Sequence, residues 1–198
     1  LELHYEITLG GRARVADRAT QVLEIKPLDE FRYGYKLWLD RETAMPLQSQ
    51  LVDGRGGVVE QIMFTEIEVP ADIPPDALEP TIETTGFAAL RSAELPALAA
   101  EISWRANQVP GGFRLSIATQ SPMAGSDAPV DHLVYSDGFA TVSVFIESAL
   151  TQSDVAEGFS NVGSTNAYTI VLSGRKVTAM GEVPPQTVRT IATSLVAR

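Results

Sequence analysis

The stretch YGYKLWLDRETAMPLQSQLVDGRGGVVEQIMF, residues 33–64, contains three runs in which apolar and polar side chains alternate, separated by two acidic breaks. A period of two residues is typical of β-strands, because successive side chains point to opposite faces of a sheet. The stretch therefore predicts an antiparallel meander of three strands. Bulky apolar residues occur on both sides of the alternation, so we expect a helix or a ligand to cover the second face.

The two breaks carry Asp40, Glu42 and Asp53, which are either metal ligands or turn residues. A calcium-binding loop needs several acidic residues at regular short spacing, closed by a bidentate glutamate, and neither break has that pattern. Aspartate and glycine are frequent in turns, since the carboxylate bonds nearby backbone amides and glycine accepts a positive φ. We interpret both breaks as turns and predict no metal site.

Further strands are predicted before this meander. Residues 3–11, LHYEITLGG, alternate with a period of two and end in Gly10–Gly11, a pair suited to a tight hairpin turn. Residues 13–28, ARVADRATQVLEIKPL, are interpreted as one long or bulged strand that stops at Pro27, with a helix as the alternative.

A proline-rich segment follows, with four prolines between residues 70 and 80. Proline has no amide hydrogen to donate to a strand ladder and stiffens the chain, so the segment indicates a linker. We predict that residues 70–100 form this linker between two β-rich parts, residues 1–69 and 101–198. The run GFAALRSAEL, residues 86–95, is predicted as a short helix within the linker.

The second part is predicted to be a small antiparallel sheet packed on a C-terminal helix, which gives a mainly β (α+β) fold class. Strands are expected within residues 102–109, 112–120, 130–147, 166–174 and 176–183, with Asp137–Gly138 as a hairpin turn and a polar loop over residues 150–165. Residues 184–198 are predicted as the helix. Its apolar stripe consists of Val188, Ile191, Ala192 and Leu195.

The composition excludes several classes of protein. The 198 residues include no cysteine and carry a formal net charge of −10. Disulfides and thiolate metal ligands are therefore excluded, and the excess of carboxylates argues against binding to nucleic acid, which needs a basic surface. No run approaches the ~18 apolar residues that predict a membrane span.

Nothing in the sequence indicates a catalytic site. The only histidines are His4 and His132, and a serine hydrolase needs a base beside its nucleophile. His132, Ser136 and Asp137 have the composition of a triad, but they lack a G-x-S-x-G motif and Ser136 lies at a predicted hairpin turn. We therefore predict no catalytic residues and no cofactor. The aromatic and methionine residues of the meander predict either plain core or an adaptable apolar groove.

Two groups of segments resemble the MucB/RseB family of periplasmic regulators of the envelope-stress sigma factor. Residues 15–27, VADRATQVLEIKP, and 33–69 are similar to the second half of that family's large domain. Three later segments resemble that family's small C-terminal domain and occur in the same order. They are GFRLS (112–116), HLVYSDGFATVSVFIE (132–147) and NAYTIVLSGRKVTAMGEVPPQTVRTIATSL (166–195).

The resemblance implies a large domain folded as an open β half-barrel like LolA and LolB, whose concave face takes acyl chains. It also implies a periplasmic, non-enzymatic protein that binds the periplasmic domain of a membrane anti-sigma factor of RseA or MucA type and shields it from proteolysis. Lipopolysaccharide or lipoprotein acyl chains are the implied signal. Because the chain begins at Leu1, inside a predicted strand, we expect the first half of the half-barrel to be absent from it. Residues 3–9 would then be an open edge able to pair with another copy.

The residues expected at sites follow from apolar alternation on the predicted strands. The groove is expected to be lined by Tyr35, Leu37, Trp38, Leu51, Met63 and Phe64, and a partner or interdomain surface to include Phe139, Val142 and Val144. The alternatives are a lipid or lipoprotein carrier of LolA type without a regulatory partner, and an enzyme with dispersed catalytic acids.

Overall fold

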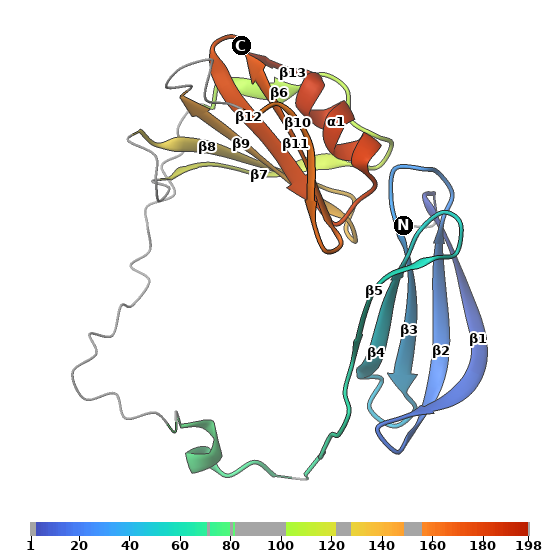
Figure 1. Ribbon diagram of the computed structural model, residues 1–198. Coiled ribbons are helices and arrows are strands. Elements are labelled where there is room, and N and C mark those ends of the chain that lie inside the picture. The colour runs from blue at the N-terminus through green and yellow to red at the C-terminus, as the bar shows by residue number, and fades with distance from the viewer. Residues whose placement is uncertain are drawn as a thin grey trace.

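The structure is a computed structural model that describes residues 3–70, 72–79, 81, 102–121, 128–148 and 156–197. These residues form two large antiparallel sheets, a two-stranded ribbon and one α-helix (Figure 1). The prediction of a mainly β fold is therefore confirmed. None of the described helices is long and apolar enough to cross a membrane.

The first sheet is an antiparallel meander with strands in sequential order. Its strands are β1 (Tyr5–Val15), β2 (Arg18–Pro27), β3 (Gly34–Asp40), β4 (Pro46–Val52) and β5 (Val58–Met63). The last three strands are the meander predicted from residues 33–64, and each is joined to the next through one of the acidic breaks. Both ends of this sheet, β1 and β5, are edge strands.

The turn between β1 and β2 differs from the prediction. It is made by Ala16–Asp17, with φ values of 47° and 60°, whereas Gly10–Gly11 lies inside β1 at a shift in register. A Cβ on Gly10 would lie 3.1 Å from the side chain of Val22, so glycine serves close packing at a bulge rather than a turn. Residues 13–28 therefore form a hairpin, not a single strand or a helix.

The second sheet has six antiparallel strands in the order β10-β11-β12-β9-β8-β7. Its strands are β7 (Arg114–Ser121), β8 (Val130–Ser136), β9 (Thr141–Ser148), β10 (Gly158–Val162), β11 (Thr165–Leu172) and β12 (Arg175–Gly181). The short strands β6 (Trp104–Ala106) and β13 (Leu195–Ala197) pair with each other, and a 3-10 helix, η1, spans Pro75–Leu78. The helix predicted over residues 86–95 lies outside the described residues.

Strand β10 corrects the prediction of a loop over residues 150–165. Four of its five residues are exposed because it is an edge strand of the second sheet. An edge strand that is open to solvent on both faces needs no alternation of apolar and polar residues, so the pattern used for the other strands could not detect it.

The core of the second sheet lies beneath α1 (Pro185–Thr193), as expected for a helix with Pro185 in its first turn. Val188, Ile191 and Ala192 are fully buried against the sheet. The helix is shorter than predicted, since Leu195 belongs to β13, although its side chain joins the same core. The sheet residues that meet the helix in this core include Leu133, Tyr135, Val142, Val144, Ile146, Val177 and Ala179.

Gly181 ends β12 against the backbone of a neighbouring strand. A Cβ at this position would overlap the carbonyl oxygen of Thr141, so Gly181→Ala should lower the free energy of unfolding by about 1–3 kcal/mol through overpacking. Urea unfolding followed by far-UV circular dichroism measures the change. Gly54→Ala is the matched control because its added Cβ meets nothing within 4 Å. Equal midpoints for Gly181→Ala and wild type would contradict the prediction.

Candidate functional site between the two sheets

The two sheets meet around Arg32, which lies in the loop between β2 and β3. This residue is only 1% exposed. Its Nε lies 3.4 Å from Oδ2 of Asp137, at the β8–β9 turn, and Nη2 donates to the carbonyl oxygen of Gly111. The guanidinium also faces two rings, with 5.4 Å to the centroid of Tyr5 and 5.1 Å to that of Phe113. Asp29, in the same loop, lies 3.4 Å from Nε as well. Five residues thus contact one cation from the first part of the chain, and three of them belong to the second part.

Asp137 connects this ion pair to the conformation of its own turn. Its Oδ2 accepts a hydrogen bond of 2.9 Å from the hydroxyl of Tyr5, and its Oδ1 accepts bonds from the amides of Phe139 (2.9 Å) and Ala140 (2.8 Å). Burial, followed by the nearby Asp137 carboxylate, raises the pKa of Tyr5. Tyr5 therefore remains a neutral donor across the physiological range.

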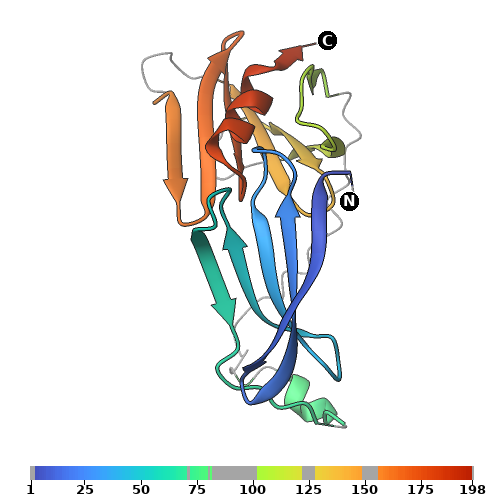
Figure 2. The ribbon, with the colours of Figure 1, turned by 90° about the vertical axis from the view of Figure 1, so that its right-hand side faces the viewer.

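A second set of polar contacts holds α1 and the β10–β11 turn against the first sheet. The Oγ1 of Thr187 donates to the carbonyl oxygen of Phe31 at 2.7 Å. The remaining bonds join Asn166 to the hydroxyl of Tyr33, Gln186 to the carbonyl of Glu30, and Ser164 to the carboxylate of Glu60. These contacts fix the first sheet directly below the second, as Figure 2 shows.

The cross-strand register of the first sheet separates an apolar face from a polar one. Residues paired directly across neighbouring strands point to the same face. One row consists of Ile7, Ile25, Tyr35, Leu51 and Glu60, and the next row on the same face of Leu9, Leu23, Leu37, Ser49 and Ile62. The row between them, Thr8, Glu24, Lys36, Gln50 and Gln61, lies on the opposite face and is polar. We call the face that carries the rows of Ile7 and Leu9 the apolar face.

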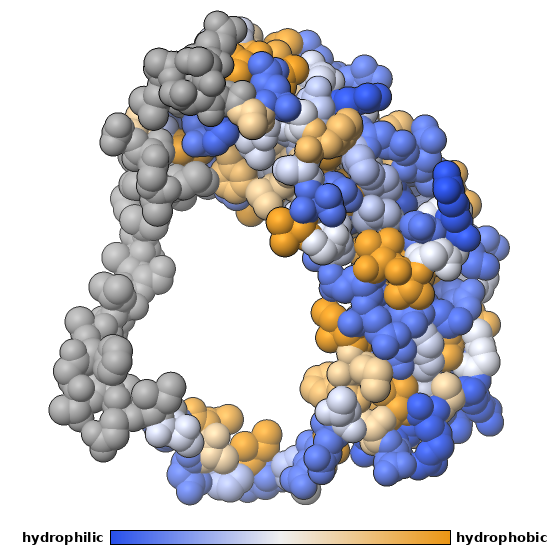
Figure 3. All heavy atoms as spheres, viewed as in Figure 1, coloured by the Kyte–Doolittle hydropathy of each residue, from blue (hydrophilic) through white to orange (hydrophobic). Residues whose placement is uncertain are grey.

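Part of the apolar face remains open to solvent. A hollow of about 330 Å³ lies beside this open part. Ile62 on β5 is 64% exposed. Phe139, from the second sheet, closes one end by packing on Tyr5 and Tyr35, at ring-centroid distances of 5.5 and 5.9 Å. The hollow is lined by Tyr35, Leu37, Pro46, Leu47, Gln48, Ser49, Ile62, Met63, Phe64 and Phe139. Apolar residues can be seen in Figure 3 where the first sheet borders the second.

Comparison with known proteins assigns this arrangement to a family. The model of the MucB/RseB N-terminal domain family matches residues 1–82, and the model of the MucB/RseB C-terminal domain family matches residues 99–196. The MucB chain in the crystal structure of MucB in complex with MucA(peri) is 30% identical in sequence to this chain. The two superimpose with a TM-score of 0.79 over 100% of this chain and 69% of that one. The chain belongs to the MucB/RseB family.

Other members of the family show the same degree of similarity. The sigma factor AlgU regulatory protein MucB of Pseudomonas aeruginosa is 36% identical over 96% of the chain, and the sigma-E factor regulatory protein RseB of Escherichia coli is 29% identical over 98%. The chain spans 60% of the length of both relatives. A structure of the Pseudomonas aeruginosa MucA/MucB complex gives a TM-score of 0.79 with 66% of that chain covered, and one of MucB gives 0.69 with 64% covered.

The structure distributes the predicted groove residues of this MucB/RseB chain over three environments. Tyr35, Leu37 and Phe64 line the 330 Å³ hollow, and Met63 borders it, although the pairing of Met63 with Gln48 places its side chain on the polar face. Leu51 shares the apolar face but is only 6% exposed, so it supports the hollow from within the core. Trp38 is placed by its pairing with Gln48 on the opposite, polar face, where the ammonium of Lys36 lies 5.5 Å from its ring centroid.

The three residues predicted for a partner or interdomain surface also separate. Phe139 is 38% exposed and contacts the first sheet through Tyr5 and Tyr35. Val142 and Val144 are 0% exposed in the core beneath α1, so they present nothing to a partner. Alternation showed that they share a face of β9, but it could not show that a helix from the end of the chain covers that face.

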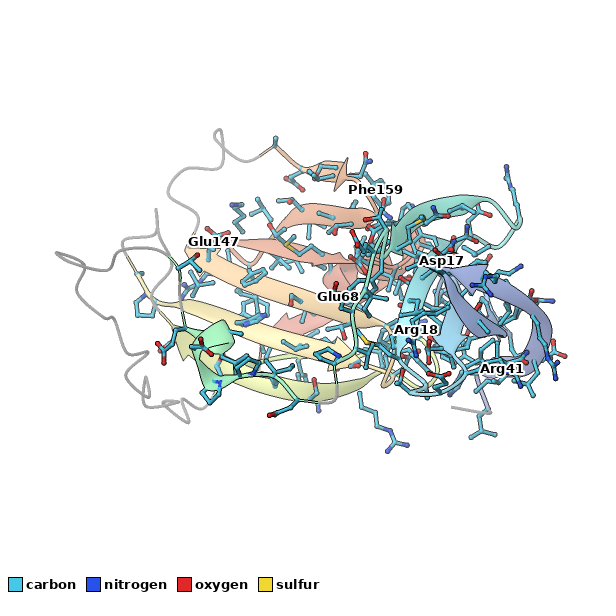
Figure 4. The ribbon with its side chains drawn as sticks, turned by 90° about the horizontal axis from the view of Figure 1, so that it is seen from below. Asp17, Arg18, Arg41, Glu68, Glu147 and Phe159 are labelled. Atoms are coloured by element: carbon cyan, nitrogen blue, oxygen red, sulfur yellow. The ribbon has the colours of Figure 1, made fainter. Side chains whose placement is uncertain are left out.

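The acidic breaks are turns, as predicted. Oδ1 of Asp53 accepts bonds from the amides of Arg55 and Gly57 at 2.8 and 2.7 Å. Asp40 caps its turn in the same way and is paired with Arg18, whose hydrogen bond holds the pKa of the Asp40 carboxyl well below its usual range. Figure 4 shows Arg18 beside Asp17 and Arg41 at this end of the first sheet. In the described part of the chain, no three acidic or histidine residues are grouped to hold a metal ion.

The residues with the composition of a triad have structural roles. Ser136 donates to the carbonyl oxygen of Ala140 at 2.9 Å, and Asp137 is occupied by Arg32 and Tyr5. Four residues along a strand separate His132 from Ser136 by about 13 Å, which is too far for proton transfer. The ring of His132 instead stacks on Phe145 at 4.5 Å.

Sequence reasoning missed the residues that join the sheets, above all Arg32 and Tyr5. Both are single polar or charged residues without a motif. Their partners are distant in sequence, since Tyr5 and Asp137 are separated by 132 residues. The only local signal was a carboxylate, Asp137, in a hairpin turn. That signal is equally well explained by turn formation.

Arg32→Ala tests the junction. The substitution leaves the Asp137 carboxylate, whose side chain is 1% exposed, without its cation, and it should lower the free energy of unfolding by about 3–5 kcal/mol. Urea unfolding measures the loss. The control is Arg105→Ala on the exposed surface of β6, which should change stability by no more than about 0.5 kcal/mol. Similar effects of the two variants would show that the junction is not a buried ion pair.

His132 should make stability depend on pH. Burial lowers the pKa of its imidazole below the usual 6.5, so the unfolded state binds the proton more readily than the folded state does. This contribution is complete above about pH 6.5 and is lost as the pH falls through and below that value. Urea unfolding between pH 7.5 and 5.5 should show a decline that His132→Gln reduces. Phe145→Leu keeps the imidazole but removes the ring stacked on it. Because less burial means a smaller pKa shift, the decline should be reduced in that variant too.

Proposed function

We propose that this chain acts in the periplasm as a regulator that binds the periplasmic domain of a membrane anti-sigma factor of MucA or RseA type. By covering that domain it would protect the anti-sigma factor from proteolysis and so restrain the envelope-stress sigma factor. In this proposal residues 1–69 and 101–198 are the two binding domains, and residues 70–100 link them.

The observation that carries the proposal is the arrangement of the two sheets. It superimposes over 100% of the chain with a TM-score of 0.79 on both structures of MucB with MucA, against 0.69 for the structure of MucB. The arrangement is maintained by the contacts of Arg32 and Asp137. A geometry close to the partner-bound structures supports a chain prepared to receive a protein partner.

The apolar face supports a lipid signal. It is exposed at Ile7 (44%), Leu9 (75%) and Ile62 (64%), and burial of such residues contributes about 25 cal/mol per Å² of apolar area. An acyl chain of lipopolysaccharide or of a lipoprotein fits this chemistry. We propose that lipid on this face weakens the binding of the anti-sigma factor.

We further propose that the chain acts by binding and not by catalysis. The functional groups that could have formed a triad are engaged elsewhere, because Ser136 bonds the backbone of its own turn and Asp137 binds Arg32. The alternative is a carrier of LolA type that transports a lipid or lipoprotein through the same apolar face. A carrier would bind lipid but not the anti-sigma factor.

Calorimetric titration of the 198-residue chain with the periplasmic domain of the anti-sigma factor from the same organism tests the proposal. The regulator should bind with micromolar or tighter affinity, about −8 kcal/mol or better, and lipopolysaccharide should weaken the binding. Titration of the anti-sigma domain into lipopolysaccharide alone is the control. Binding of lipid without any binding of the anti-sigma domain would favour the carrier.

A further inference from the structure

We propose that the outer edge of β5, together with the hollow beside it, is a docking site for an extended segment of the regulatory partner. The segment would add to the first sheet as a sixth strand next to β5. This inference rests on the proposed function, because it names the part of the chain that holds the partner. The segment it fits has apolar side chains at alternate positions and at least one basic residue.

Strand β5 ends the first sheet, with β4 on its inner side. Five of its six residues are exposed, and only Glu60 is partly covered. The exposed residues include Val58 at 54%, Ile62 at 64% and Met63 at 47%. A long apolar edge strand presents unpaired backbone groups that another strand can pair with.

The direction of the backbone amides on β5 follows from one hydrogen bond. The amide of Phe64 donates inward to the carbonyl oxygen of Leu47 at 2.9 Å. Amides alternate in direction along a strand, so the amide of Ile62 also points toward β4, while those of Gln61 and Met63 point outward. These two outward donors and the carbonyl groups beside them can be satisfied by a strand of a partner.

Natural edge strands are usually protected by proline, lysine or a covering segment. Residues 58–64, VVEQIMF, contain neither proline nor lysine, and Glu60 is their only charge. The next acidic residues, Glu66 and Glu68, are exposed, and residues 58–69 contain no basic residue. This local negative charge favours a segment that carries lysine or arginine.

The hollow supplies side-chain selectivity next to the edge. Ile62, Met63 and Phe64 line it from β5 and the residue that follows, and Phe139 closes it from the second sheet. In strand addition, backbone hydrogen bonds give affinity and pockets for alternate side chains give specificity. An edge beside an apolar hollow of about 330 Å³ provides both in one place.

An extended peptide fits this site better than the other occupants. A lipid acyl chain can fill the hollow, but it has no groups to pair with the outward amides of Gln61 and Met63. A second copy of β5 could pair with the edge, but both strands would carry Glu60, Glu66 and Glu68 and no basic residue. Two segments of like net charge repel each other. A basic segment of a different protein avoids this repulsion.

The exposed edge strand of the second sheet, β10, lies on the same side of the molecule as β5. It is exposed at Phe159 (53%) and Val162 (85%). Ser164, in the turn after β10, bonds the carboxylate of Glu60 on β5. Figures 2 and 4 both show β10 and β5 on one side, with Phe159 near β5 in the view from below. A segment along β5 can therefore reach both domains.

The decisive experiment removes one outward amide. Gln61→Pro eliminates the donor, while its ring is tolerated on an open edge. Gln61→Ala is the matched control, since both variants lose the side-chain bonds to Gln48 and Gln50 but only the proline loses the amide. In the calorimetric titration with the anti-sigma domain, we expect Gln61→Pro to raise Kd by about tenfold or more and Gln61→Ala to leave it within about twofold of wild type.

A second pair of variants tests the hollow. Ile62→Lys introduces a charge into its lining and should weaken binding at least about tenfold. Leu78→Lys changes a residue of similar exposure, 74%, in η1 and should have no effect. Circular dichroism of each variant checks folding. Hydrogen exchange should show slower exchange of the Gln61 and Met63 amides when the anti-sigma domain is bound.

The outcomes separate this inference from the proposed function. Binding by the wild-type chain that Gln61→Pro and Ile62→Lys leave unchanged, in folded protein, overturns the β5 site and keeps the regulator. An effect of Gln61→Pro on self-association alone, measured by sedimentation, assigns the edge to a second copy and overturns it too. Loss of lipid binding only, with Kd for the anti-sigma domain unchanged, assigns the hollow to lipid. No binding by wild type overturns both proposals.

Discussion

The arrangement of the two sheets depends on the burial of one guanidinium, that of Arg32. Its side chain is 0% exposed, and its Nε lies 3.4 Å from both Asp29 and Asp137. Removing two opposite charges from water costs nearly as much as their attraction returns, so such a pair contributes little net stability. It does penalise every arrangement that buries one charge without the other. The pair therefore determines how the sheets meet more than how tightly they are held.

The same carboxylate links this junction to the apolar hollow. Oδ2 of Asp137 serves Arg32 and Tyr5, while Oδ1 caps the turn that carries Phe139. Phe139 in turn packs on Tyr35 and closes the end of the hollow. The position of this ring is consequently coupled to the domain arrangement. Any change in how the sheets meet would also change the shape of the hollow.

Local sequence pattern predicted what is local in this fold and failed where distant contacts decide. Alternation located β3, β4 and β5, and the turn chemistry of Asp53 was correct, because both are set by neighbouring residues. The β1–β2 turn was misplaced since Ala16–Asp17 adopts positive φ, a conformation for which glycine is the usual residue. The burial of Val144 and the pairing of Arg32 depend on elements far along the chain, and neither leaves a periodic signal.

The geometry of β5 relates the two proposed ligands of the chain. Side chains of a strand point out of the sheet, whereas its unpaired amides lie in the plane of the sheet. A lipid on the apolar face and a peptide on the edge would therefore use different groups of β5, yet both would need the hollow at Ile62 and Phe64. Two ligands that need the same hollow weaken each other's binding, and linkage requires the two effects to be equal. Release of the partner by lipid then needs no contact between distant sites, only competition for the space that Phe139 closes.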